Sequence, residues 1–160
     1  RLYYKKGGKR TSSVINRIVK SGDYGFPIWT RPNSIDLRLE LGYWEAALVL
    51  GTRANGYNNV LTLTDRKTSI GFARIIQSKS PHTINSELTK VIKDNKLQVK
   101  TITQDSGSEY IKIAILARWI NRKIYSAEPY ATMQIVSNQK WISFLRTKFK
   151  KGFDFNTITH

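Results

Sequence analysis

Clustered cations are the side chains of this sequence with the clearest chemical use. The segment 1–11 is basic and includes Lys5, Lys6, Lys9 and Arg10. A Lys or Arg side chain close to a phosphate releases condensed counterions, so a basic arm gains affinity for nucleic acid. We therefore expect this segment to track the phosphates of a polyanion. The alternative is a solvated, partly disordered tail.

Groups that could carry acid–base or metal chemistry are few and scattered. Asp105 follows a predicted strand and precedes Ser106-Gly107, where its side chain could stabilise the turn through hydrogen bonds to the backbone. His82 and His160 lie too far apart in sequence to suggest a shared site, and both are expected on the surface. The chain has no cysteine, which excludes disulfide scaffolds and thiolate metal sites.

The overall charge points to a polyanionic partner. Lys and Arg number 27 against 11 Asp and Glu, a net charge of +16, far from the near-neutral surface usual for a small-molecule enzyme. A membrane surface is the competing partner, but no apolar run approaches the roughly 20 residues of a spanning helix, and no signal peptide opens the chain. We therefore expect a soluble, cytoplasmic protein. The start at Arg1, without methionine, is typical of a fragment.

The hydrophobic pattern predicts one globular α/β domain, since 160 residues that are 40% hydrophobic can bury a proper core. Three runs rich in β-branched residues predict an antiparallel meander of strands at 43–51, 60–65 and 69–77. Helical periodicity and alternation then predict a helix from Pro81, a strand at 98–104, a helix at 111–120, a strand at 123–126 and a helix at 133–149. Hairpins followed by alternating strands and helices indicate a mixed sheet with helices on its faces. Core packing is expected for Trp44, Trp119 and Trp141, with contact to DNA or a partner as the alternative.

Sparse motifs in a fixed order carry a family resemblance. They are 35–38 with 42–51, then 61–68, then 100–110, and finally 125–130 with Asn138, Arg146, Lys151-Gly152 and Asp154-Phe155. Together they resemble the integrase-type catalytic core of IS-thirty-like bacterial insertion-sequence transposases, over roughly residues 27–156. The resemblance implies a ribonuclease-H-like α/β fold. Its five-stranded mixed sheet would have three antiparallel strands followed by two parallel ones, with helices on both faces.

The same family implies an Asp, Asp, Glu triad that binds two Mg²⁺ or Mn²⁺ ions for DNA cleavage and strand transfer. Two hard cations about 4 Å apart stabilise the entering and leaving oxygens of an in-line phosphodiester displacement, and carboxylates are their natural ligands. Carried over to this chain, the triad falls on Ala47, Asp105 and Gln139. Only Asp105 keeps a carboxylate, so we expect catalysis to be lost or weakened. Decay, repurposing and engineered inactivation are open explanations, and further changes around Gln139 argue against engineering alone.

Other residues are candidates for compensation or for DNA contact. Glu45 and Asp65 are the acidic residues that could rescue a metal site, and ion pairing within a basic protein is the alternative. In a core of this family the last helix would border the active site. Its basic cluster is therefore expected to contact phosphates, with a solvated helix face as the alternative. The cluster comprises Lys140, Arg146, Lys148, Lys150 and Lys151.

The sequence thus favours a transposase core with weakened catalysis. We expect it to bind double-stranded DNA at element ends and target in the bacterial cytoplasm, associated with the nucleoid, and to form a homo-oligomer. Residues 1–40 would form a basic arm or linker, 41–156 the core domain and 157–160 a tail. Two alternatives remain open: a non-catalytic DNA-binding regulator derived from a transposase, and a basic RNA-binding protein of ribosomal type.

Overall fold

The computed structural model describes residues 25–52, 58–110, 112–128 and 131–158. Its strands are β1 (Phe26–Pro27), β2 (Tyr43–Val49), β3 (Asn59–Asp65), β4 (Gly71–Ile76), β5 (Thr101–Gln104) and β6 (Lys123–Ser126). Its α-helices are α3 (Asn33–Asp36), α4 (Pro81–Asp94), α5 (Ile113–Ile120) and α6 (Val136–Lys148). Short 3-10 helices cover Ile28–Thr30, Ser108–Tyr110, Thr132–Ile135 and Phe155–Thr157.

A single mixed sheet with the strand order β1-β6-β5-β2-β3-β4 organises the chain. The meander β2-β3-β4 is antiparallel, and β5, β6 and β1 continue from β2 as parallel strands. The expected mixed α/β sheet with an antiparallel first part is therefore confirmed. The sheet has six strands rather than five, because Phe26 and Pro27 pair with Tyr125 and Ser126 at the edge.

The additional strand β1 comes from the segment expected to be an arm. Gly25, at a φ of +80°, lies so close to β6 that a Cβ there would meet the carbonyl oxygen of Ile124 at 2.7 Å, which explains why a residue without a side chain precedes this strand. Ile28 and Ile35 follow and are buried against Tyr43 and Tyr125. Residues 25–40 thus contribute to the packed fold.

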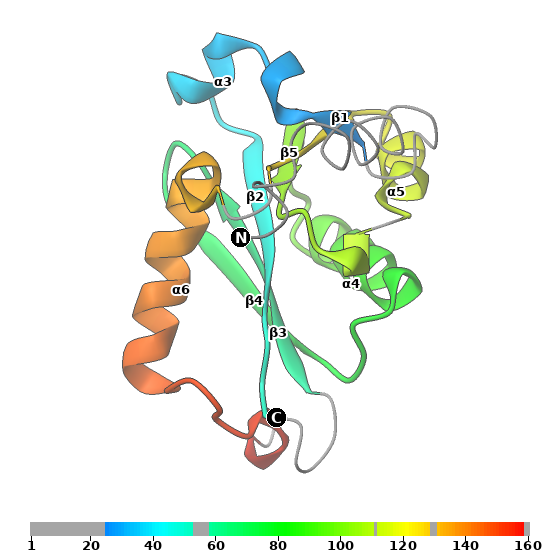
Figure 1. Ribbon diagram of the computed structural model, residues 1–160. Helices are drawn as coiled ribbons and strands as arrows, with labels where there is room; N and C mark the ends of the chain where they lie inside the picture. The colour runs from blue at the N-terminus through cyan, green and yellow to red at the C-terminus, as the bar shows by residue number, and fades with distance from the viewer. Residues whose placement is uncertain (1–24, 53–57, 111, 129–130, 159–160) are drawn as a thin grey trace, which may run out of the picture.

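Helices cover both faces of the sheet, as expected, with α4 and α5 on one side and α6 on the other (Figure 1). The alternation of β2 explains this division. Trp44 and Ala46 belong to the main core under α4 and α5, whereas Ala47 and Val49 contribute to the smaller clusters on the α6 side. No helix in the described parts of the chain has the length and apolar character needed to cross a membrane.

The three tryptophans that were expected in the core occupy different environments. Trp44 is buried, as expected, and its Nε1 donates to the carbonyl oxygen of Gln98. Trp119 is 49% exposed and carries the ammonium of Lys93 above its ring, so the expectation of core packing is wrong for this residue. The apolar residues of α5 occupy more of the helix surface than the sheet covers, so some of them, including Trp119, remain exposed. Trp141 lies on α6 against Gly71 of β4, where a Cβ would meet the indole nitrogen at 2.2 Å.

Candidate functional site

The three positions aligned with the family triad meet at one cavity. Ala47 lies on β2, Asp105 directly follows β5, and Gln139 lies in the first turn of α6; all three line a cavity of about 450 Å³. Strands β2 and β5 are parallel neighbours, and the N–H of Asp105 donates to the carbonyl oxygen of Ala46. The fold therefore brings together the positions that the sequence motifs single out.

The residues that line this cavity carry more positive than negative charge, unlike the acidic lining of a metal site. Among the described residues that line it, Asp105 supplies the only carboxylate, and Arg146 and Lys151 add two positive charges. Asp105 also accepts a hydrogen bond from the N–H of Ser106 at 2.7 Å, the local turn contact that is the alternative role for this residue. In the described parts of the chain, no three His, Cys, Asp or Glu side chains are grouped so that they could hold a metal ion.

The first triad position has become part of a hydrophobic cluster. Ala47 is 3% exposed and packs with Ala127 and Ile135, and the partly buried Ile142 lies against them. A methyl group at position 47 suits these neighbours, because it adds no unpaired polar atom to a buried place. The surroundings of position 47 are thus apolar.

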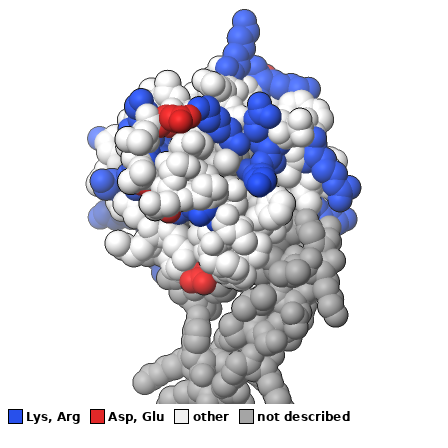
Figure 2. Space-filling view, turned by 90° about the horizontal axis from the view of Figure 1, so that it is seen from above, with Lys and Arg blue, Asp and Glu red and all other residues white. Residues whose placement is uncertain are grey.

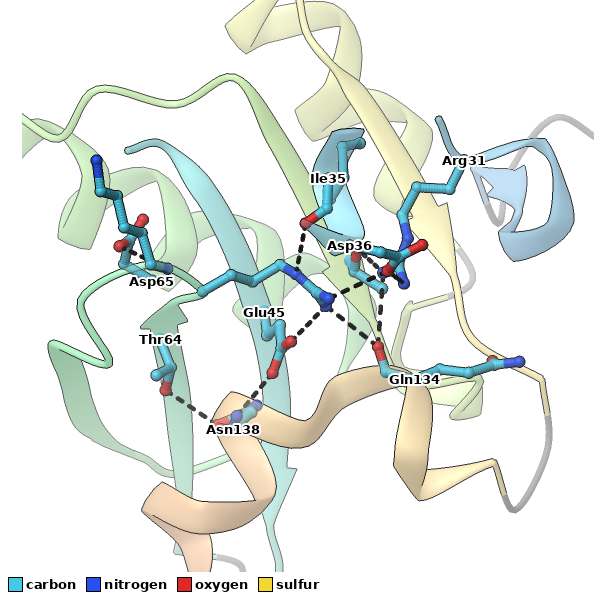
Figure 3. A network of polar contacts seen from close by, with 11 residues as sticks. Arg31, Ile35, Asp36, Glu45, Thr64, Asp65, Gln134 and Asn138 are labelled. Atoms are coloured by element: carbon cyan, nitrogen blue, oxygen red, sulfur yellow. Dashed lines mark hydrogen bonds and ion pairs between the residues drawn. The ribbon is translucent and has the colours of Figure 1, made fainter. Parts of the chain in front are cut away.

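Glu45, a candidate for compensation, is committed to a buried ion pair. Its side chain is fully buried (0% exposed). One carboxylate oxygen accepts from Arg66 at 2.6 Å. The other accepts from the N–H of Asn138 at 2.7 Å, and Figure 3 shows Glu45 and Asn138 facing each other. Burial raises the pKa of Glu45, and the N–H of Asn138 and the Arg66 guanidinium act in the opposite direction. Glu45 is not among the residues that line the triad cavity.

Arg66 extends this network to the segment before β2. Its Nη2 lies 3.1 Å from Asp36, its Nε donates to the carbonyl oxygen of Ile35, and Asp36 also accepts from Arg31 (Figure 3). A guanidinium is suited to such a position, since its several N–H groups can satisfy several acceptors at once. The network therefore ties α3, β2 and the residues that follow β3 into one unit.

Asp65, the other candidate for compensation, stabilises the turn after β3. One of its carboxylate oxygens accepts from the N–H of Gly42, and the other accepts from the N–H groups of Lys67 and Thr68 and from the Thr68 hydroxyl. Asp65 does not line the triad cavity either. The fold thus uses both carboxylates within the protein.

The sequence motifs include Asn138, but its role in the site was not predicted from the sequence. It is fully buried, and its side-chain oxygen accepts from the hydroxyls of Thr62 and Thr64 on β3 at 2.8 and 3.2 Å. Its backbone N–H donates to Glu45. Three residues from two strands therefore fix the position of the residue just before Gln139. The threonines at alternating positions of β3 were the available signal, but their partner lies more than 70 residues away.

The basic cluster of α6 divides into one structural residue and a set of exposed cations. Arg146 donates to the carbonyl oxygens of Leu50, Phe149 and Lys150, so its guanidinium closes the carboxyl end of the helix. The other members are exposed: Lys140, Lys148, Lys150 and Lys151. His82 is exposed, as expected. Lys5, Lys6, Lys9, Arg10 and His160 lie outside the described residues.

Sequence comparisons link the chain to transposases. No protein-family model matches it. It is 26% identical over 163 residues to the transposase for insertion sequence element IS4351 of Bacteroides fragilis, covering 99% of this chain and 48% of the relative. It is 28% identical over 152 residues to the transposase InsI for element IS30C of Escherichia coli (strain K12), covering 94% of this chain and 37% of the relative. The chain thus spans less than half the length of these relatives.

Structural comparisons identify the fold. The chain matches the catalytic core domain of BIV integrase with a TM-score of 0.54 and 11% identity, covering 66% of each chain. It matches a chain of the simian T-cell lymphotropic virus intasome with a TM-score of 0.61 and 15% identity, covering 74% of this chain and 44% of that one. The HTLV-2 integrase catalytic core, solved with magnesium, matches with a TM-score of 0.50 and 10% identity, covering 67% and 70%. The integrase-type, ribonuclease-H-like fold expected from the motifs is confirmed.

Proposed function

We propose that this chain, which resembles the integrase-type core of IS30-like bacterial transposases along nearly its whole length, acts on DNA in transposition with its two-metal chemistry lost or much weakened. The observation that carries the proposal is the cavity shared by Ala47, Asp105 and Gln139. The triad positions converge as a catalytic site requires, but two of the three lack the carboxylate.

The residues of the cavity do not fit a pair of Mg²⁺ or Mn²⁺ ions. Such ions prefer oxygen ligands, but Ala47 offers none and Gln139 offers at most an uncharged carbonyl. Arg146 and Lys151 line the same cavity and would repel a cation. We therefore derive no cleavage step through metal ions for this chain.

Binding to the DNA backbone is the part of the family function that the side chains can still perform. Lys140, Lys148, Lys150 and Lys151 are exposed on and after α6, next to the cavity that Arg146 and Lys151 line. Exposed cations of this kind contact phosphates and position a duplex without reading its sequence. We propose double-stranded DNA as the partner, self-association on DNA, and a location with the bacterial nucleoid in the cytoplasm.

A nicking and strand-transfer assay with labelled duplex DNA and Mn²⁺ tests the proposal. The chain is compared with the double variant Ala47→Asp, Gln139→Glu, and with the same double variant that also carries Asp105→Asn. We expect no cleavage by the chain, cleavage by the double variant, and loss of that cleavage when Asp105 is replaced. Cleavage by the unchanged chain would contradict weakened catalysis and would direct attention back to Glu45 and Asp65.

A DNA-binding measurement on the same proteins distinguishes the explanations that are left if neither the chain nor the double variant cleaves DNA. If the chain and the double variant are both silent, but the chain binds duplex DNA with an affinity that falls steeply with salt, the function is that of a non-catalytic regulator derived from a transposase. If it binds structured RNA in preference to duplex DNA, the proposed function is wrong.

A further inference from the structure

A second cavity lies at the opposite end of the strands that form the triad site. It measures about 380 Å³, and its lining includes Tyr43, Thr101 and Lys123, the first residues of β2, β5 and β6. These three residues are paired in register across the adjacent parallel strands. The triad cavity, by contrast, lies where β2 and β5 end. Nothing in the proposed function uses this second cavity.

The charged residues that line this cavity are basic. They are Lys100, Arg122 and Lys123, and no Asp or Glu is among the described residues of the lining. Figure 2 looks onto this end of the molecule and shows several groups of Lys and Arg among uncharged side chains, with few acidic side chains. Lys100 is paired with Glu40, and its side chain is still 37% exposed. Arg122 and Lys123 are exposed.

Two features indicate that the cavity is arranged for an anion rather than merely basic. Arg122 donates through Nε to the carbonyl oxygen of Val99 and through Nη1 to that of Asn121. The guanidinium is thereby held in place, and its Nη2 has no partner among the described residues. The hydroxyl of Thr101 is buried and likewise lacks a hydrogen-bond partner in the described part of the chain. An unpaired buried hydroxyl is costly, and a rotation of the Thr101 side chain toward the cavity would let this hydroxyl donate to an anionic oxygen bound there.

We propose that this cavity binds a phosphate of duplex DNA, as a second contact that extends beyond the triad site. Thr101 and Asp105 are four residues apart along β5, roughly 13 Å at about 3.3 Å per residue. A duplex rises about 3.4 Å per nucleotide of one strand, so one duplex is long enough to contact both cavities. The lysine ammonium groups, the fixed guanidinium of Arg122 and the unpaired hydroxyl of Thr101 are groups that donate hydrogen bonds to phosphate oxygens.

Salt-dependent binding to a labelled duplex tests this proposal on the complete chain. The double variant Arg122→Gln, Lys123→Gln is compared with Lys79→Gln, an exposed lysine outside both cavities. We expect the double variant to bind about tenfold more weakly at low salt, with a plot of log affinity against log salt that is less steep by about one unit, the change for one lost phosphate contact. Lys79→Gln should leave the slope unchanged.

The variant Thr101→Val provides a second test of this site that does not change the charge of the protein. Valine keeps the shape and the strand preference of threonine but removes the orphan hydroxyl, so folding should be as stable as before or more so. We expect the affinity for DNA to fall severalfold. An unchanged slope and affinity in the Arg122→Gln, Lys123→Gln variant would overturn the second site even if the unchanged chain binds DNA. Absence of DNA binding by the unchanged chain would overturn both proposals.

Discussion

The backbone N–H of Asn138 donates to the carboxylate of Glu45 at 2.7 Å. Glu45 lies two residues before Ala47 on β2, and Asn138 directly precedes Gln139. One hydrogen bond thus joins the strand of the first triad position to the helix of the third. Residues other than Ala47 and Gln139 thus hold β2 and α6 together at this site, and this contact does not depend on a carboxylate at either position.

Glu45→Gln should destabilise the protein by about 3 kcal/mol, because it leaves Arg66, which is 4% exposed, without its buried countercharge. Urea unfolding at neutral pH measures the change. Glu40→Gln is the matched control, since it removes the carboxylate of an exposed ion pair with Lys100 and should have little effect. If Glu45→Gln lowers the free energy of unfolding by no more than Glu40→Gln does, the buried pair of Glu45 with Arg66 does not stabilise the fold as proposed.

Ala47→Asp should lower stability by about 2 kcal/mol or more in the absence of divalent ions, because the new carboxylate would be buried beside Ala127 and Ile135. In the Ala47→Asp, Gln139→Glu variant, Mn²⁺ at about 100 times its dissociation constant should return about 2.7 kcal/mol. Thermal unfolding with and without Mn²⁺ measures both effects. Similar stabilisation of the unchanged chain by Mn²⁺ would mean that it already has a metal site.

Tyr110→Phe should stabilise the protein by about 1 kcal/mol, because the buried Tyr110 hydroxyl has no partner among the described residues. Burial, with a smaller contribution from Glu109 and Asp105, raises the pKa of Tyr110 well above its ordinary value of 10.0.

A phenol with a raised pKa in the folded state favours folding fully below pH 10, and that contribution is lost as the pH rises toward the folded value. The parent chain should therefore lose stability above pH 10 more steeply than Tyr110→Phe. Chemical unfolding at a series of alkaline pH values measures the difference, and parallel curves for the two proteins would contradict this role of Tyr110.

Arg146→Gln and Lys148→Gln should separate stability from DNA binding. Arg146 donates to three carbonyl oxygens near the end of α6, so its loss should cost about 1–2 kcal/mol of folding free energy. Lys148 is exposed, and its replacement should leave stability unchanged but weaken the affinity for duplex DNA and reduce its salt dependence. Thermal unfolding and DNA titration on both variants give the comparison. If Lys148→Gln binds DNA like the parent, the phosphate role of this face is wrong.

The sequence predicts the antiparallel meander and the parallel strands after it because these depend on local patterns, and the meeting of Ala47, Asp105 and Gln139 follows from the family resemblance. Strand β6 occupies the expected residues 123–126, and the last helix was expected three residues before the actual start of α6 at Val136. Strand β1 could not be predicted, since two residues are too few to show alternation.

The sequence also could not predict which side chains become partners when they lie far apart in the chain. Alternation places Glu45 on the face of Ala47, but it does not identify Arg66 or Asn138 as its partners. Likewise, a row of cations on a helix does not show that Arg146 closes the helix end while its neighbours remain free for phosphates. The second cavity was missed because its residues come from the starts of three strands that meet only in the folded sheet.

The contact between Gly71 and Trp141 gives one strand of the meander control over a wall of the triad cavity. A single methyl group at position 71 would meet the indole nitrogen at 2.2 Å, so the indole of Trp141, or α6 together with it, would have to shift. Gln139 is only two residues from Trp141, so a shift of α6 would move a residue that lines the cavity. The space available to the helix beside the cavity is therefore limited by a residue of β4 that does not line it.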